Sequence, residues 1–164
     1  RDSSLRLVGS EMCIRDSDMT HISDQLSIAA PIAVVFDTVA DSRNEPAFNP
    51  AMTSVEMLTP EPIGLGTRFR ALMGKGQMEM LVELTAYDRP AQLHSHTTSS
   101  MMETSGAITF TSDGDSTVMA WDRHVQPKGW LRALGPLFGP LGRLMERKIW
   151  TGMKHMVENR PTAI

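Results

Sequence analysis

Apolar and polar residues alternate where the first regular pattern of the chain begins. Over residues 21–28 the even-numbered positions are mostly apolar and the odd-numbered ones polar, which is typical of a half-buried β-strand. Pro31 then stands where a helix can begin, and the short apolar stripe after it ends near Asp41. We therefore expect a strand, a short helix and, over the proline-containing residues 43–50, a helical turn or loop.

Strand patterns fill the middle of the chain and are separated by turn residues. The turn at residues 75–76 predicts a hairpin that sets Phe69 opposite Val82 on a wholly apolar face. The expected strands are residues 53–58, 67–73, 77–87, 92–99, 102–111 and 117–125.

The turn at residues 113–114 predicts a second hairpin, in which Gly106 lies opposite Trp121. The polar run around this turn makes the register less certain. A slip by one residue would reverse the two faces of the hairpin, because successive strand residues point to opposite sides.

The apolar period changes to steps of three and four after Pro127, which predicts a long amphipathic helix. Pro136 and Pro140 should kink or break its first third, because each removes an internal hydrogen bond. This order of elements is an α+β plan in which a curved antiparallel sheet of about seven strands wraps around the terminal helix, with two short helices after the first strand.

Composition and charge narrow the class of protein. The 164 residues carry a net charge of -3 and no clustered lysine or arginine, so we expect no nucleic-acid partner. No apolar stretch is long enough for a transmembrane helix, and we expect no integral membrane association. Because no export signal is visible, the default expectation is a cytoplasmic protein.

Residues 1–17 show neither helical nor strand periodicity. Their core, VGSEMCIRDS, resembles translated sequencing-adapter read-through, and the alternative is a disordered native tail. We therefore set residues 1–18 apart as a non-native or disordered tail and expect one domain over residues 19–164. The single cysteine, Cys13, belongs to the tail, so thiol chemistry and cysteine-ligated metal are not expected in the domain.

Several motifs resemble a known family when they are taken together and in order. They are IAAPIAVVFDTVADSRNEPAFNP at residues 28–50, IGLGTRF at 63–69, the YDRP step at 87–90, GDST before the last strand, and the ending MKHMVEN. Over residues 21–159 the chain resembles the SRPBCC superfamily, also called START-like or helix-grip, and within it the polyketide cyclase/dehydrase and lipid-transport group. The resemblance implies a helix-grip fold with an internal tunnel, and Phe48 stands where a tryptophan is usual, which implies a slightly roomier entrance.

Methionines on the expected inner face of the sheet can fill an ordinary core or line a cavity that adapts to a guest. Arg123 shares the parity of the inward residues, and its guanidinium could bind a carboxylate, phenolate or carbonyl group of a ligand. Alternatively, it pairs with Glu103 or with the terminal helix. The expected cavity residues are Phe36, Phe48, Phe69, Met73, Met80, Val82, Met102, Ile108, Met119, Trp121, Arg123, Leu137, Leu141, Met145 and Ile149.

Histidines offer weaker candidates for chemistry. His94 and His96 share one strand face and could form a metal or acid-base pair, or simply a solvated surface. Asp122 and His124 also share a face, which the expected register turns outward. Asp122 and His124 would otherwise suit a base and the residue that orients it, whereas no carboxylate or third ligand can be assigned to His94 and His96 from the sequence. We expect no metal and no cofactor.

The leading functional hypothesis is binding or carriage of a small hydrophobic molecule, such as a lipid, polyketide or aromatic metabolite, between sheet and helix. An alternative is a polyketide cyclase or dehydratase that uses the same cavity, with Arg123, His94 and His96 as catalytic candidates. A third reading is an interaction domain without a ligand. The basic residues of the terminal helix, with Trp130 and Trp150, could also place it on a membrane surface, although the sheet needs its apolar face.

Overall fold

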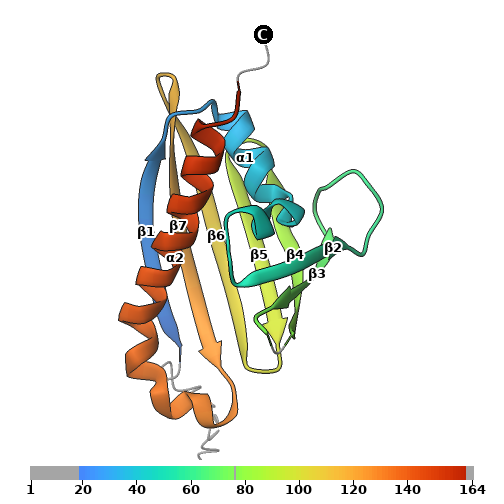
Figure 1. The fold of residues 1–164 in the computed structure, drawn as a ribbon, viewed down its shortest axis with the longest axis vertical. Helices are drawn as coiled ribbons and strands as arrows, with labels where there is room; N and C mark the ends of the chain where they lie inside the picture. Colours follow the sequence, from blue (N-terminus) through green and yellow to red (C-terminus); the bar gives the residue numbers. More distant parts are fainter. Residues whose placement is uncertain (1–18, 76, 162–164) are drawn as a thin grey trace, which may run out of the picture.

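The computed structural model describes residues 19–75 and 77–161, so the expected tail lies outside the described residues. Figure 1 shows one sheet crossed on one side by a long C-terminal helix. The elements in chain order are β1 (Thr20–Ile28), α1 (Ile32–Ala40), the 3-10 helix η2 (Ser42–Ala47), β2 (Met52–Met57), β3 (Arg68–Met73), β4 (Met78–Asp88), β5 (Gln92–Ser99), β6 (Met102–Asp113), β7 (Ser116–Pro127), the 3-10 helix η3 (Gly129–Leu134) and α2 (Gly135–Glu158).

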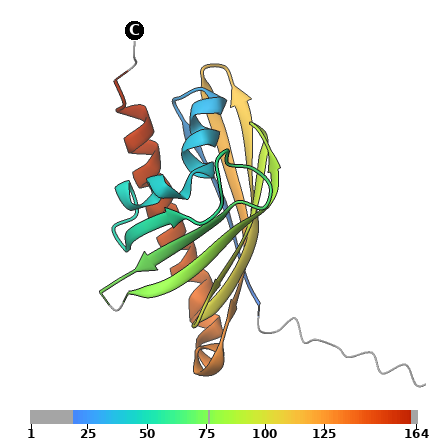
Figure 2. The same ribbon diagram turned by 90° about the vertical axis from the view of Figure 1, so that its right-hand side faces the viewer.

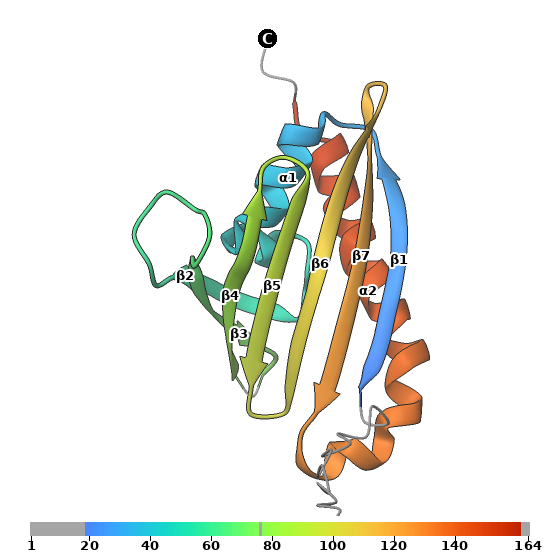
Figure 3. The same ribbon diagram turned by 180° about the vertical axis from the view of Figure 1, so that it is seen from behind.

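The seven strands form one antiparallel sheet in the order β1-β7-β6-β5-β4-β3-β2, so the first strand pairs with the last. The side view shows that the sheet curves toward α1, η2 and α2, which all lie on its concave side (Figure 2). Seen from behind, the convex face carries none of the helices of residues 19–75 and 77–161 (Figure 3). The expected helix-grip architecture is confirmed.

The β3–β4 hairpin has the predicted register. Phe69 lies opposite Val82, and Arg68 lies opposite Glu83. Gly74 adopts a φ of 66°, a left-handed conformation that glycine reaches without steric strain, and its carbonyl accepts a hydrogen bond from the backbone N–H of Gln77. The turn chemistry and the two-faced pattern of the strands therefore agree.

The predicted register of the β6–β7 hairpin is wrong by two residues. Trp121 lies opposite Ile108, and Gly106 lies opposite Arg123. The reason is the turn: Gly114, with a φ of 60°, is the first central residue rather than the second, as in a type II′ turn. A shift by two keeps every side chain on its expected face, so the assignment of inward and outward residues survives.

α2 is one continuous helix from Gly135, so of the two expected effects of the prolines, a kink or a break, the break does not occur. Pro136 lies in the first turn, where a backbone N–H has no helical partner to lose, and only Pro140 lies inside the helix. In the described part of the chain, no helix is both long and apolar enough to cross a membrane.

The core lies on the concave side, between the sheet and the C-terminal half of α2. Phe36 of α1 packs edge-on against Phe110 of β6, with ring centroids 5.1 Å apart. Trp121, Met119 and Met153 have almost no exposed surface. Burying such large side chains provides most of the favourable free energy of folding.

Candidate functional site

A group of polar side chains lies on the concave side, at the border of the apolar core. Arg123 of β7 points toward α2, where its Nε lies 3.5 Å from Glu146 Oε1 and its guanidinium carbon lies 5.8 Å from the ring centre of Trp150. Trp150 Nε1 donates a hydrogen bond of 2.8 Å to Glu146 Oε2. Arg123 thus pairs with the terminal helix, one of the two partners expected for it, whereas Glu103 pairs with Lys128 at 3.2 Å.

Glu45 of η2 adds a second carboxyl to this group. Burial raises its pKa above the usual range, and the negative charge of Glu146 raises it further. Arg123 and a hydrogen bond of 3.0 Å donated by Asn49 Nδ2 act in the opposite direction. This group therefore contains one guanidinium and two carboxyls, of which that of Glu45 holds its proton more tightly than an ordinary glutamate does.

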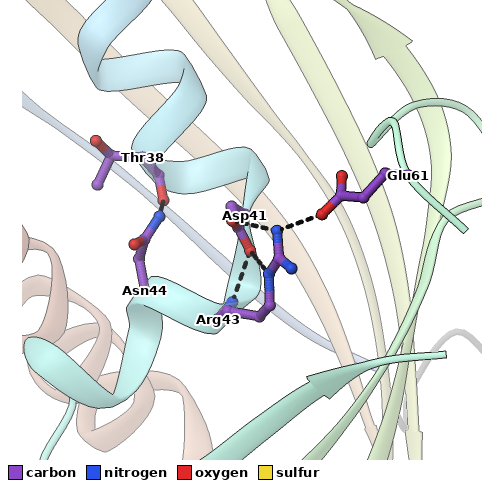
Figure 4. A network of polar contacts seen from close by, with 5 residues as sticks. All are labelled: Thr38, Asp41, Arg43, Asn44 and Glu61. Carbon is purple, nitrogen blue, oxygen red and sulfur yellow. Dashed lines mark hydrogen bonds and ion pairs between the residues drawn. The ribbon is translucent and has the colours of Figure 1, made fainter. Parts of the chain in front are cut away.

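A network of polar contacts holds η2 in place (Figure 4). Arg43 Nε and Nη2 donate to the two carboxylate oxygens of Asp41 at 2.8 and 2.9 Å, and Nη2 also donates to Glu61 Oε1 at 2.9 Å. These two carboxylates raise the pKa of Arg43. Asn44 Nδ2 donates to the carbonyl oxygen of Thr38 at 3.1 Å. The network ties η2 to the end of α1 and to the loop before β3, and so positions Glu45.

Two buried donors of β7 have no hydrogen-bond partner among the described residues. They are Trp121 Nε1 and Arg123 Nε, on residues that share one face of the strand. The 3.5 Å approach of Arg123 Nε to Glu146 is an ion pair without hydrogen-bond geometry. An unpaired buried donor costs about 1–3 kcal/mol. An acceptor atom supplied by a ligand would remove part of this penalty.

The expected cavity residues fall into three groups in the structure. The first group is buried in or beside the core and consists of Phe36, Phe48, Phe69, Ile108, Met119 and Trp121. The second group is partly buried and consists of Met73, Met80, Val82, Met102, Arg123 and Ile149. Leu137, Leu141 and Met145 are 66%, 55% and 50% exposed, so their assignment to the cavity wall is corrected.

The physical reason for this correction is visible in Figure 1. The first part of α2 runs along the edge of the sheet and extends past it. Among the described residues, its leucines remain largely exposed. Helical periodicity reports which residues share a side of a helix. It does not report whether another element covers that side.

His94 and His96 lie on the opposite face of the sheet from Arg123. His94 Nε2 lies 2.8 Å from Gln92 Nε2, and His96 faces Glu83 and Ser105 across the neighbouring strands. A shallow hollow of the convex face is lined by Thr85, His94, Ser95, His96, Ser105, Gly106, Ala107, Asp122 and His124. The histidines and Arg123 therefore cannot act on the same group of one small ligand.

Sequence reasoning missed both carboxyls of the concave group. Neither carboxyl was among the expected site residues, although the spacing of four residues between Glu146 and Trp150 was a usable signal. Glu45 lies in a segment without periodicity, and its place beside β7 depends on contacts between distant parts of the chain.

A family model described as "Polyketide cyclase / dehydrase and lipid transport" matches residues 19–159. Among solved structures, TTHA0849 from Thermus thermophilus is 18% identical with a TM-score of 0.71, and the match covers 84% of this chain and 96% of that one. A START superfamily protein from Mycobacterium smegmatis is 18% identical with a TM-score of 0.65, covering 85% and 95%.

The di-domain ARO/CYC BexL from the BE-7585A biosynthetic pathway is 17% identical with a TM-score of 0.64. The match covers 92% of this chain and 52% of BexL. At these identities the likenesses show a shared fold. No curated protein matches the chain.

Proposed function

Because the chain belongs to the polyketide cyclase/dehydrase and lipid transport family, we propose that it binds a small hydrophobic ligand between the concave face of the sheet and α2. The ligand class is a lipid, a polyketide or an aromatic metabolite that carries at least one oxygen acceptor. The observation that carries the proposal is the pair of unpartnered buried donors, Trp121 Nε1 and Arg123 Nε. A carboxylate, phenolate or carbonyl oxygen of the ligand would accept from them.

The apolar part of the ligand would lie against the methionines of the inner wall. Met73, Met80 and Met102 face inward but are only partly buried, so they are not closed off by the core. Methionine side chains are flexible and polarizable, and they repack around guests of different shapes. Such a wall suits a ligand whose body is apolar and whose polar contacts are few.

A cyclase or dehydratase activity is the second candidate, and the environment of Glu45 favours it. A carboxyl with a raised pKa next to a guanidinium can donate or accept a proton at a reacting carbon or oxygen. In this reading Arg123 holds the carbonyl oxygen of the substrate while Glu45 moves the proton. Glu45→Gln would then abolish turnover of a linear poly-β-ketone analogue while leaving its binding within about threefold, since the amide keeps the shape of the site.

Binding is tested by intrinsic fluorescence, because two of the three tryptophans belong to the proposed site. Trp130 is exposed, so Trp130→Phe removes the background signal and leaves Trp121 and Trp150 as reporters. Oleate and an anthraquinone serve as probes for the lipid and aromatic classes. We expect saturable quenching by at least one of them, confirmed as a 1:1 complex by native mass spectrometry.

Arg123→Leu is the test variant and Arg143→Leu the matched control, since Arg143 is an exposed arginine of α2. We expect Arg123→Leu to weaken the binding of oleate, the acidic probe, about tenfold, which is the effect of losing one charge-assisted hydrogen bond. Arg143→Leu should leave the affinity for oleate unchanged. The binding proposal is wrong if no probe from either class quenches the reporters, or if both variants bind alike.

A further inference from the structure

Three side chains that no part of the proposed function uses converge on the convex face. His21 of β1 lies directly opposite His124 of β7, and Asp122 precedes His124 by two residues on the same face. His21 Nε2 lies 2.9 Å from Asp122 Oδ1, and His124 Nε2 lies 3.5 Å from the same oxygen. The three possible ligand atoms all lie within 4.8 Å of one another. We infer that His21, Asp122 and His124 form a binding site for a divalent transition-metal ion of the zinc type.

The spacing of the three atoms matches the coordination sphere of such an ion. Zinc lies about 2.0–2.2 Å from nitrogen and carboxylate ligands, so tetrahedral ligand atoms lie about 3.3 Å apart. The two distances to Asp122 lie on either side of that value. The imidazole rings of His21 and His124 are stacked, with centroids 4.9 Å apart and planes inclined by 25°. Small side-chain rotations would therefore bring both nitrogens onto one ion.

The backbone that carries the triad is already ordered. All nine residues of β1 pair with β7 in one unbroken antiparallel register, so the positions of the three Cα atoms do not depend on the ion. In the described part of the chain, Asp122 forms ion pairs only with the two histidines, and no lysine or arginine competes for its oxygens. A preformed, uncontested donor set binds with a smaller loss of entropy.

The donor set selects the class of metal. Two imidazoles and one carboxylate suit zinc and its late transition-metal neighbours, whereas calcium and magnesium prefer sites built entirely from oxygen. Three protein ligands leave a fourth position for water or a small molecule. The hollow beside the triad keeps that position accessible, because the residues that β6 contributes to it, Ser105, Gly106 and Ala107, are all small.

The test is a zinc titration of the full chain, followed by isothermal calorimetry. The protein carries no polyhistidine tag, and Cys13→Ala is present in every variant so that no thiol contributes. We expect one zinc ion per chain, and cobalt substitution should give the visible absorption of a tetrahedral nitrogen and oxygen site. His21→Ala and His124→Ala should each weaken zinc binding more than about 100-fold, because loss of a direct ligand exceeds the 10–100-fold effect of an outer-shell partner.

The matched control is His96→Ala, which removes a histidine of the same face that lies two strands away from His124. Zinc affinity should be unchanged in this variant. The side chains of His21, His96 and His124 are at least partly exposed, so the three substitutions should leave the thermal unfolding of the metal-free protein unchanged. The inference is overturned if zinc does not bind, or if His96→Ala weakens binding as much as His124→Ala does.

The site lies on the face opposite Arg123, so this inference does not rest on the proposed ligand binding. The zinc titration and the fluorescence titration succeed or fail independently.

Discussion

The two halves of α2 carry the same apolar period but have different surroundings. In the second half, Trp150, Met153 and Val157 are buried against the core. In the first half, Leu137, Leu141 and Leu144 are 55–66% exposed. The contacts of the first half with β1 come instead from small residues: a Cβ at Gly139 would meet Thr20, and one at Gly142 would meet Ile22.

This difference shows when a row of apolar side chains along a helix stabilises a fold. Such a row stabilises the protein only where another element packs against it and removes it from water. The second half of α2 meets the sheet and η2, whereas most of the first half runs along the edge strand β1, with its glycine side toward that strand. The same sequence pattern is therefore core in one half and exposed surface in the other.

The largest expected difference between the halves is in the free energy of unfolding. Met153 is completely buried, so Met153→Ala should lower it by about 2–5 kcal/mol through lost contacts and a cavity. Leu141→Ala, the control in the exposed half, should change it by less than about 0.5 kcal/mol. Urea denaturation of both variants measures the two values, and equal effects would contradict the comparison.

Glycines sharpen the comparison, because the same substitution should have opposite signs in the two halves. At Gly152 a new Cβ would lie 2.8 Å from the backbone oxygen of Phe48, so Gly152→Ala should destabilise the protein by about 1–3 kcal/mol. At Gly139 the nearest atom is the Thr20 methyl at 3.7 Å, an ordinary contact. Gly139→Ala should therefore stabilise by about 0.5–1 kcal/mol, as expected for alanine in a helix. Thermal unfolding monitored by circular dichroism should move in opposite directions for the two variants.

Where the halves meet, Arg147 of α2 binds Asp24 of β1. The hydrogen bond from Arg147 lowers the pKa of Asp24 below its usual value of 3.8, with a smaller contribution from the backbone N–H of Gln25. A lowered carboxyl pKa stabilises the fold above the unfolded value, and this contribution is lost as the pH falls through the folded value. Because Arg147 is half-exposed and solvent screens the pair, Asp24→Asn should cost only about 0.5–1 kcal/mol at pH 7.

The control for Asp24 is the free energy of unfolding, measured by urea denaturation at pH 7 and again well below pH 3.8. At the lower pH the wild-type carboxyl is protonated and, like the amide of Asp24→Asn, uncharged. The difference in the free energy of unfolding between the two proteins should therefore disappear. A difference that persists in acid would show that the amide disturbs packing rather than an ion pair.

The smallest expected effect on stability belongs to the exposed leucines. Leu137→Ser combined with Leu144→Ser should leave the free energy of unfolding within about 1 kcal/mol of wild type. It should nevertheless shorten retention on a hydrophobic-interaction column, because it removes apolar surface that faces water. Unchanged retention would mean that these side chains are covered in solution.

The alternation of apolar and polar residues was sufficient to predict most of the strands and helices. The residues of the turns decided whether the register of each predicted hairpin was correct. The β3–β4 hairpin was predicted correctly because its alternation and its glycine turn agree. The β6–β7 register failed by two residues because Asp113-Gly114 is an equally good turn signal one position away from the turn that forms. The parity of Arg123 survived, which is why its inward direction was predictable.

Contacts between distant segments were not predictable in this way. Glu45 and Arg123 come together only after η2 packs beneath the sheet. His21 and Asp122 are 101 residues apart in the chain, and only the pairing of the first strand with the last makes them neighbours. Periodicity within one element carries no information about such pairs.

The pairing of β1 with β7 also sets an order of events during synthesis. A ribosome adds about 5–20 residues per second, so the 101 residues between His21 and Asp122 correspond to a delay of about 5–20 s. During that interval the first strand has emerged without its partner, and both of its edges are open to other chains. The nascent protein would therefore gain most from chaperones that hold its first strand until the last one arrives.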